Sequence, residues 1–422
     1  MRVTRRTAYV LLAAASALPR LVALLYERGD ITSAFVDKGD DFAQTFLESG
    51  TYGFIPEIPS AYTQPLYGFF LIPLYWVLER HWLVIGLAHV VVAVTTAWLV
   101  YELARRLLDV RGALLAALLT TLHPYLVWHD VHMNREILDH FLAAAAVLLT
   151  LLVAQRQSAP RNRLFLGGAL GVTLGLMVLG NVRTLFVPLI LGAYVLWRRR
   201  GWTWEPAIAL GVAALVVVPW VVRNETNVGC AAITTDARAL WKANNEHTLE
   251  TLRGGGWIDD VPNIRGAPPS PQDAAELYFE TGRLVRTDEC AQMRFYRERA
   301  LDFVQEQPGE KARLALFGAK LLWQPWVFQT EGRPGKGTWL DLGRSIAEPA
   351  FMIAVYLLAA YGLTLVPRHF TVLALALLGY QTIVAMLFVG ATRYRVPFDF
   401  LLMIPAASAF LGLTRKRARS ER

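Results

Sequence analysis

Long apolar stretches recur along the whole chain, and they constrain its fold more than any other feature. A run of about 20 apolar residues is long enough to cross the hydrocarbon core of a membrane. Only 18% of the residues are charged and the mean hydropathy is +0.35, whereas about a quarter of the residues in soluble domains are charged. We therefore predict an all-α polytopic membrane protein with about ten transmembrane helices. The predicted spans are 8–27, 84–104, 112–128, 136–154, 164–180, 184–197, 205–222, 346–365, 369–389 and 397–413.

Arginine clusters mark one side of these spans. They occur in every second loop, whereas the short loops between them hold few cations. Because Lys and Arg stay on the cytoplasmic side, both termini are predicted to be cytoplasmic in a multi-pass protein of the cytoplasmic (inner) membrane. The first helix is expected to be retained, since no A-x-A-like cleavage site follows its long apolar region. The clusters are Arg2, Arg5 and Arg6; Arg105, Arg106 and Arg111; Arg156, Arg161 and Arg163; 198–200; Arg368; and the tail 415–422.

This topology divides the chain into three parts. Residues 1–222 are predicted to form an N-terminal transmembrane catalytic module, whose first external loop is 28–83. Residues 223–345 are predicted to form a mostly helical external soluble domain. Residues 346–422 hold the C-terminal transmembrane helices and a basic cytoplasmic tail.

The two external segments carry features of their own. In the first loop, residues 65–80 are apolar, aromatic and interrupted by proline, which is typical of a helix lying in the membrane interface. In the second segment, residues 274–308 have helical periodicity. The only two cysteines, Cys230 and Cys290, both fall in the second segment. An external compartment allows a disulfide between them but does not require one.

Polar and charged side chains gather at the external ends of the predicted helices. Such groups are costly in a membrane, and they are functional candidates by default. Each external end offers a carboxylate or a guanidinium, which predicts an external cavity that binds an anion and contains acid groups. No Walker A motif and no GxGxxG after a strand is found, so a nucleotide-driven pump is not indicated. The residues are Asp37, Asp40 and Asp41; Trp128, His129, Asp130, His132, Asn134, Arg135 and Asp139; Arg183; Arg223 and Asn224; and Arg393 and Arg395.

This mixture of arginines and carboxylates suits the transfer of a group from a phosphate-linked donor. Arginine binds phosphate through a planar, permanently charged fork. Arg135 lies at the start of the fourth predicted helix, where backbone N–H groups also favour an anion. A carboxylate can deprotonate an acceptor hydroxyl, and a phosphate leaving group needs no protonation. A hydrolase would normally need two paired carboxylates instead.

Four stretches, in this order along the chain, carry a family likeness. They are DKGDDFAQTFLESGTYGF followed by QPLYGFF; NREILDHFLAAAAVLL; VVPWVVRNETNVG followed by LWKANNEHTLETLRGGG; and RYRVPFDFLLMIPAA. Together they resemble the membrane glycosyltransferases of the GT-C fold, especially the polyprenyl-phosphate-sugar-dependent branch. That branch includes protein O-mannosyltransferases and the lipid A aminoarabinose transferase.

The resemblance implies that an acid of the first loop is the catalytic base and that the reaction inverts the anomeric centre. Asp41 and Asp40 are expected to be the acid pair, with Asp37 behind them, and the choice among the three stays open. The partners would be a polyprenyl-phosphate-linked sugar donor, a glycan, lipid or protein acceptor, and membrane lipids. The expected donor-phosphate ligands are Arg135, Arg223, Arg393, Arg395 and Arg183, and the expected supporting residues are Asp139, Tyr394, Asn224, Asn244 and Asn245.

Several of these residues also have a purely structural interpretation. The three aspartates could belong to a solvated loop that caps a helix beginning at Asp41. Arg135 and Asp139 are four residues apart on one helical face and could form an internal salt bridge. Arg393 and Arg395 could extend to the membrane interface.

No metal site is predicted. His129 and His132 share a helix face and are the weak candidates, but hydrogen bonds at the helix end explain such histidines better than zinc does. No cofactor is predicted, although a divalent metal ion is left open because some members of the resembled family use one.

The sequence thus predicts an inverting glycosyltransferase that moves a sugar from a polyprenyl-phosphate donor to an acceptor hydroxyl on the external (periplasmic) face of the cytoplasmic membrane. The alternative is a transporter or flippase of a lipid-linked anionic sugar. A transporter should show internal repeats and breaks near the middle of the membrane, and neither is evident. Because the basic residues are dispersed between apolar segments, nucleic acid is not an expected partner.

Overall fold

The computed structural model describes residues 4–34, 36–155, 160–201, 203–326 and 339–420. Within these ranges the chain is helical and forms no strand, apart from an isolated bridge between Ile55 and Ile58. The long helices are α1 (Arg5–Glu27), α4 (Trp82–Ala104), α7 (Glu136–Ala154), α8 (Pro160–Gly180), α10 (Trp204–Val228), α16 (Trp339–Gly362), α17 (Arg368–Leu387) and α19 (Phe400–Ser420).

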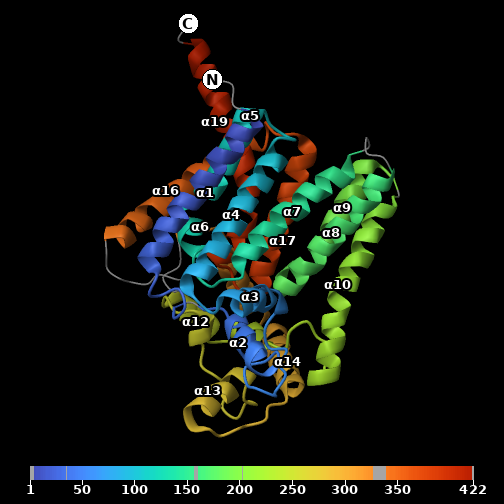
Figure 1. Ribbon diagram of the computed structural model, residues 1–422, viewed down its shortest axis with the longest axis vertical. Coiled ribbons are helices and arrows are strands. Elements are labelled where there is room, and N and C mark those ends of the chain that lie inside the picture. Colours follow the sequence, from blue (N-terminus) through green and yellow to red (C-terminus); the bar gives the residue numbers. More distant parts are fainter. Residues whose placement is uncertain (1–3, 35, 156–159, 202, 327–338, 421–422) are drawn as a thin grey trace.

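Shorter helices connect these long ones, and some of them, among them α2, α12, α13 and α14, cover one end of the bundle (Figure 1). They are α2 (Gly39–Ser49), α3 (Pro65–Leu78), α5 (Val110–Thr121), α6 (Pro124–His129), η1 (Val182–Thr184), α9 (Val187–Arg199), α11 (Arg238–Lys242), α12 (Thr248–Arg253), η2 (Ile258–Asp260), α13 (Pro271–Thr281), α14 (Glu289–Glu306), α15 (Pro308–Trp323), α18 (Thr392–Arg395) and η3 (Val396–Phe398).

Seven helices of the described chain are long and apolar enough to cross a membrane, so this is a multi-pass membrane protein. An eighth span results if the pair Thr392–Phe398 and Phe400–Thr414, bent by 61°, is counted as one. The predicted all-α membrane architecture is confirmed, but the count of ten is not.

Two predicted spans are too short in the structure. Residues 112–128 divide into α5 and α6, because Pro124 at the first position of α6 cannot continue the preceding helix. The span 184–197 becomes α9, whose 13 residues extend only about 20 Å at 1.5 Å per residue. A bilayer core is about 30 Å thick.

Small residues let the long helices pack closely. A Cβ atom on Gly171 or Gly175 of α8 would lie 2.6 Å from atoms of α10, namely the carbonyl oxygen of Ala209 and Cβ of Val216. Such close backbone approach is typical of helix pairs in membranes. The bundle core between α4, α5, α7, α17 and α19 is filled by buried Ala, Leu, Val and Phe side chains.

Both chain termini lie at one end of the bundle, and α2, α12, α13 and α14 lie at the other (Figure 1). The first loop and the segment after α10 therefore meet over the same end. The predicted helix at 65–80 forms as α3, and its position in the membrane interface stays a prediction. The periodic stretch 274–308 forms two helices, α13 and α14, because Gly282 ends α13 in the left-handed conformation.

One carboxylate, which stands next to a disulfide, holds these two segments together. Cys230, just after α10, is bonded to Cys290 in the first turn of α14. The neighbouring Glu289 accepts hydrogen bonds from the backbone N–H of Ala61 (3.0 Å) and from the hydroxyl of Thr235 (2.7 Å). These contacts fix the first loop against the segment that follows α10, and both segments continue directly into the cavity described next.

Candidate active site

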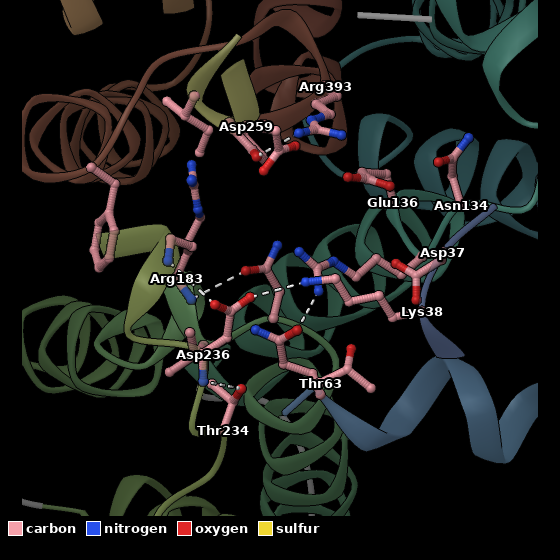
Figure 2. A pocket seen from close by; sticks show the side chains of 18 of the residues that line it. Asp37, Lys38, Thr63, Asn134, Glu136, Arg183, Thr234, Asp236, Asp259 and Arg393 are labelled. Atoms are coloured by element: carbon pink, nitrogen blue, oxygen red, sulfur yellow. Dashed lines mark hydrogen bonds and ion pairs between the residues drawn. The ribbon is translucent and has the colours of Figure 1, made fainter. Parts of the chain in front are cut away.

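A cavity of about 340 Å³ lies between the first loop, the start of α7, η1, the segment around 234–259 and the connection from α17 to α18 (Figure 2). It is lined by charges of both signs. The cations are Lys38, Arg135, Arg183 and Arg393, and the carboxylates are Asp37, Glu136, Asp236 and Asp259.

Asp37 is the first-loop acid that lines this cavity. Its backbone N–H donates to the carbonyl of Met133 (2.9 Å), which attaches the loop to the chain just before α7. Its Oδ1 accepts the backbone N–H of Gly39 at 2.8 Å. Burial raises the pKa of the Asp37 carboxyl above its ordinary value, and the positive charge of Arg135 opposes that rise.

Asp40 and Asp41 lie outside the cavity. Asp40 is almost completely buried and forms an ion pair with Arg80 (2.8 Å), and its Oδ1 accepts the hydroxyl of Tyr75 at 2.5 Å. Asp41 is exposed on the surface of α2. Asp37 precedes α2, whereas Asp40 and Asp41 belong to its first turn, where successive residues turn by about 100° around the axis and so face different surroundings.

Arg135 and Glu136 occupy the N-terminal end of α7 and line the cavity together. Arg135 donates through Nη1 to the side chain of Gln64, so it too is connected to the first loop. Both Arg135 and Asp139 are described, and no ion pair within 4.0 Å joins them. Asp139 lies one helical turn after Arg135 and does not line the cavity. It accepts a hydrogen bond from Nδ2 of Asn181 (2.8 Å) instead.

Arg183 and Arg393 share one aromatic partner, Tyr394. The guanidinium of Arg183 lies 3.5 Å from the centre of the Tyr394 ring, and its Nη1 donates to the carbonyl of Val389 at 3.1 Å. Arg393 donates to the Tyr394 hydroxyl (3.0 Å) and lies 5.1 Å from the ring of Trp257. Cation–π contact and hydrogen bonds therefore orient two arginines towards one side of the cavity.

Arg223 and Arg395 lie elsewhere, in structural contacts. Arg395 is 1% exposed, pairs with Asp399 at 3.1 Å and donates to the backbone carbonyls of Leu322 and Gln324. Arg223 donates to the carbonyls of Tyr52 and Ser60 at 2.8 Å. Neither residue lines the cavity, so the structure separates them from the other three candidate phosphate ligands.

The three predicted asparagines do not line the cavity, and each donates to backbone carbonyls. Asn224 donates to the carbonyl of Ala232 at 2.8 Å. Asn244 donates to Leu240 and Leu387, and Asn245 donates to Trp241. Their amides fix the course of the chain around the cavity.

Of the two weak metal candidates, His129 and His132, only His129 lines the cavity. Its Nε2 lies 3.8 Å from Oε2 of Glu136. His132 is fully buried, with Nδ1 3.0 Å from the carbonyl oxygen of Trp128. In the described part of the chain, no group of three or more His, Cys, Asp or Glu side chains is arranged to hold a metal ion.

An ion pair that sequence reasoning missed crosses the cavity wall. Lys38 binds Asp236 at 3.1 Å and lies 4.5 Å from the centre of the Tyr62 ring (Figure 2). Burial alone would raise the pKa of Asp236, but the charge and hydrogen bond of Lys38, helped by the backbone N–H of Ala239, lower it. Lys38 stands beside Asp37 in the sequence and could have been considered. Asp236 is 198 positions away, and no spacing indicates it.

The chain also buries an ion pair that the sequence analysis recognised only in part. Asp130 was noted as a polar residue near the fourth predicted span, but its partner was not. Arg20, in the middle of α1, is 2% exposed, binds Asp130 at 2.7 Å and donates to the carbonyl of Thr121. This pair lies outside the cavity and holds α1 against the α5–α6 connection.

Comparison with known proteins identifies the architecture. Residues 63–222 match the family model described as dolichyl-phosphate-mannose-protein mannosyltransferase. The structure matches the oligosaccharyltransferase AglB of Archaeoglobus fulgidus in complex with an inhibitory peptide and a dolichol-phosphate. That match has a TM-score of 0.57 at 14% identity and covers 99% of this chain and 52% of that one. This chain has the GT-C glycosyltransferase fold.

A second structure of the A. fulgidus oligosaccharyltransferase, tethered with an acceptor peptide, matches with a TM-score of 0.55 at 13% identity, covering 98% of this chain and 50% of that one. ArnT of Cupriavidus metallidurans bound to undecaprenyl phosphate gives 0.47 at 14% identity, over 97% and 78% of the two chains. No curated protein matches the sequence. The GT-C resemblance stated from the sequence is confirmed, and this chain spans about half the length of the oligosaccharyltransferases that it matches.

Proposed function

We propose that this protein is an inverting glycosyltransferase that moves a sugar from a polyprenyl-phosphate donor to an acceptor hydroxyl at the external face of the cytoplasmic membrane. One observation carries the proposal. A single cavity brings the carboxylate of Asp37 together with the guanidinium groups of Arg135, Arg183 and Arg393. The matched family model and the GT-C fold support the same reaction class.

The three arginines are suited to hold the donor phosphate. Each is permanently charged, and Arg183 and Arg393 are oriented by the same tyrosine. Arg135 adds a third cation at the N-terminal end of α7, where backbone N–H groups favour an anion. Together they would bind the donor before reaction and stabilise the extra negative charge that develops as the phosphate leaves.

Asp37 is the proposed base. Its carboxylate takes the proton of the acceptor hydroxyl while the acceptor oxygen attacks the anomeric carbon. The bond from that carbon to the phosphate oxygen breaks, and polyprenyl phosphate leaves with the bonding electron pair. A single displacement of this kind inverts the anomeric centre, and it needs no second carboxylate to protonate the leaving group.

The location follows from charge. The first loop and the segment after α10, which line the cavity, lie at the end of the bundle opposite both termini (Figure 1). The described helix ends that carry basic clusters in the sequence, those of α4 and α9, lie at the same end as the termini (Figure 1). With Lys and Arg on the cytoplasmic side, the cavity faces outward. The segments 1–222, 223–345 and 346–422 then act as catalytic module, external cover and C-terminal helices.

The test follows acceptor-dependent release of polyprenyl phosphate by the purified full-length protein in lipid, supplied with a panel of polyprenyl-phosphate sugars. We expect Asp37→Asn to lower turnover by about 10²- to 10⁴-fold, the usual contribution of a positioned base, while donor binding is kept. Asp41→Asn is the matched control, since it makes the same change on the exposed face of α2.

Two results would overturn the assignment. Loss of turnover in Asp41→Asn with full activity in Asp37→Asn would move the base out of the cavity. Binding of a lipid-linked sugar without any release of polyprenyl phosphate, whatever acceptor is supplied, would favour a transporter.

A further inference from the structure

The ends of α4, α7 and α9 and the start of α17 lie at the opposite end of the bundle, where both termini are found (Figure 1), and they carry a second group of cationic side chains. An open cavity of about 510 Å³ lies there between the turn after α4, the ends of α7 and α9, and the start of α17. We call it the basic cleft, and we define it by Arg106, Arg198, Arg200 and His369. Its remaining lining is Leu107, Leu151, Ala154, Gln155 and Tyr194, so it contains no carboxylate.

The three consecutive arginines at the end of α9 have different surroundings. Arg199 is 6% exposed, donates to the carbonyls of Val153 and Gln155, and lies 3.5 Å from Glu205. Arg198 and Arg200 are exposed and line the cleft, and in the described part of the chain neither forms an ion pair with a carboxylate. The fold therefore neutralises the middle charge and leaves the outer two available.

Arg200 also has an unusual backbone. It ends α9 in the left-handed conformation, with φ 56°. Glycine adopts this conformation without steric cost, whereas a side chain with a Cβ is disfavoured there. An arginine at this position is explained if its side chain is needed in the cleft.

The apolar surroundings indicate a lipid rather than a soluble anion. Trp197, half exposed, lines an adjoining cavity that shares Arg198, Arg200 and His369 and adds Arg368. Exposed tryptophan is typical of the headgroup level of a membrane. Leu107 and Leu151 supply an apolar wall on the bundle side.

We propose that the basic cleft binds the phosphate headgroup of an anionic phospholipid in the cytoplasmic leaflet. The preference of Lys and Arg for cytoplasmic loops explains how many cations lie at this end. It does not explain why they line a cavity without carboxylates beside an exposed tryptophan. Basic pockets between membrane helices on the cytoplasmic side are suited to acidic lipid headgroups.

The test uses the full-length protein in a neutral detergent and measures its thermal midpoint as phosphatidylglycerol, phosphatidylcholine or inorganic phosphate is added. A ligand that binds the folded state raises the midpoint. We expect phosphatidylglycerol to raise it, and the other two compounds to have no comparable effect. Native mass spectrometry of the same samples counts the lipid that stays bound.

Arg198→Gln combined with Arg200→Gln should weaken phosphatidylglycerol binding about 30-fold, at about 1 kcal/mol for each cation. Each single variant should weaken it about fivefold, which keeps the test valid if the double variant folds poorly. Arg111→Gln is the matched control, an exposed arginine at the same end of the bundle but outside the cleft, and it should bind like the native chain.

Three results would overturn the proposal. They are equal stabilisation by phosphatidylcholine, equal stabilisation by inorganic phosphate, and a loss of binding in Arg111→Gln as large as in the cleft variants. Because the basic cleft and the active-site cavity lie at opposite ends of the bundle, failure here leaves the proposed glycosyl transfer unaffected, and the reverse also holds.

Discussion

Asp37 differs from its two neighbouring aspartates in what surrounds it. Asp40 forms an ion pair with Arg80 and accepts a hydrogen bond from the hydroxyl of Tyr75, and Asp41 is exposed. Asp37 lies in a partly closed cavity whose other groups include three arginines and Lys38. Burial makes its ionised form a stronger base, and Arg135 keeps that form accessible. This balance suits a group that must accept a proton and then release it.

The pH dependence of activity follows from that balance. A base must be ionised to act, and the pKa of Asp37 is raised, so kcat/KM should fall as pH is lowered through a value above the ordinary 3.8 of aspartate. Arg135→Gln removes the cation that lowers this pKa most, and it should move the acid limb to higher pH. The measurement is the pH profile of kcat/KM for both proteins. An acid limb that stays in place in Arg135→Gln would show that Asp37 does not set it.

At the scale of single elements, the close contact of α15 with α17 supports the arginine-bearing connection to α18. Gly318, in the middle of α15, faces the carbonyl oxygen of Ala385 in α17, and a Cβ there would overlap that oxygen. Gly390, which follows α17, lies against the backbone of Gly318 in the same way. The backbone that leads to Arg393 is therefore packed directly on α15.

Gly318→Ala should separate these two helices. We expect the substitution to lower stability by about 1–3 kcal/mol, as overpacking does, and to weaken donor binding through displacement of Arg393. Gly379→Ala is the control, since a Cβ in that part of α17 meets nothing within 4 Å, and it should be neutral or stabilising. The measurements are the thermal midpoint and the KM for the donor. Equal effects of the two substitutions would contradict the packing argument.

At the scale of the whole molecule, two segments far apart in the sequence build the cavity over the bundle. The disulfide between Cys230 and Cys290 fixes the start of α14 to the end of α10, and Glu289, next to Cys290, bonds to the first loop at Ala61 and to Thr235. The ion pair of Lys38 and Asp236 lies on the cavity side of the same junction. The segment after α10 thus contributes side chains to the candidate active site in addition to covering it.

Cys290→Ser should loosen this junction. The disulfide closes a separation of 60 residues, which corresponds to about 4 kcal/mol in a chain-entropy treatment. We therefore expect a lower thermal midpoint and reduced turnover. A reducing agent should lower the midpoint of the native protein and leave that of Cys290→Ser unchanged. A native midpoint that does not respond to complete reduction would contradict this role.

Much of the fold could be predicted from local sequence patterns. Long apolar runs indicate membrane helices because the length and hydropathy of a segment can be read directly from its sequence. The long helices α1, α4, α7, α8, α10, α16, α17 and α19 all lie on predicted spans. The predicted number of membrane spans was not confirmed, because in two places a local detail of the sequence decided the length of the helix. Pro124 divides one predicted span, and the 13 residues of α9 are too few for another.

The candidate site, too, could be predicted only in part from the sequence. The sequence by itself indicated the acids of the first loop and the arginines at one end of the helices as candidate functional groups, because charge is expensive near lipid and is seldom present without a use. It favoured Asp41 and Asp40 over Asp37 and left the choice open, whereas Asp37 is the one of the three that lines the cavity. Which acid faces the cavity depends on how the first loop packs against the helix bundle.

Only the tertiary structure decided which of these charges meet. It combines Asp37 with Arg135, Arg183 and Arg393, adds Asp236 from the distant segment after α10, and assigns Arg223 and Arg395 to structural contacts. The physical reason is that electrostatic interaction depends on distance and burial in space. Residues nearly 200 positions apart in the sequence come close together and become buried only when the helices pack.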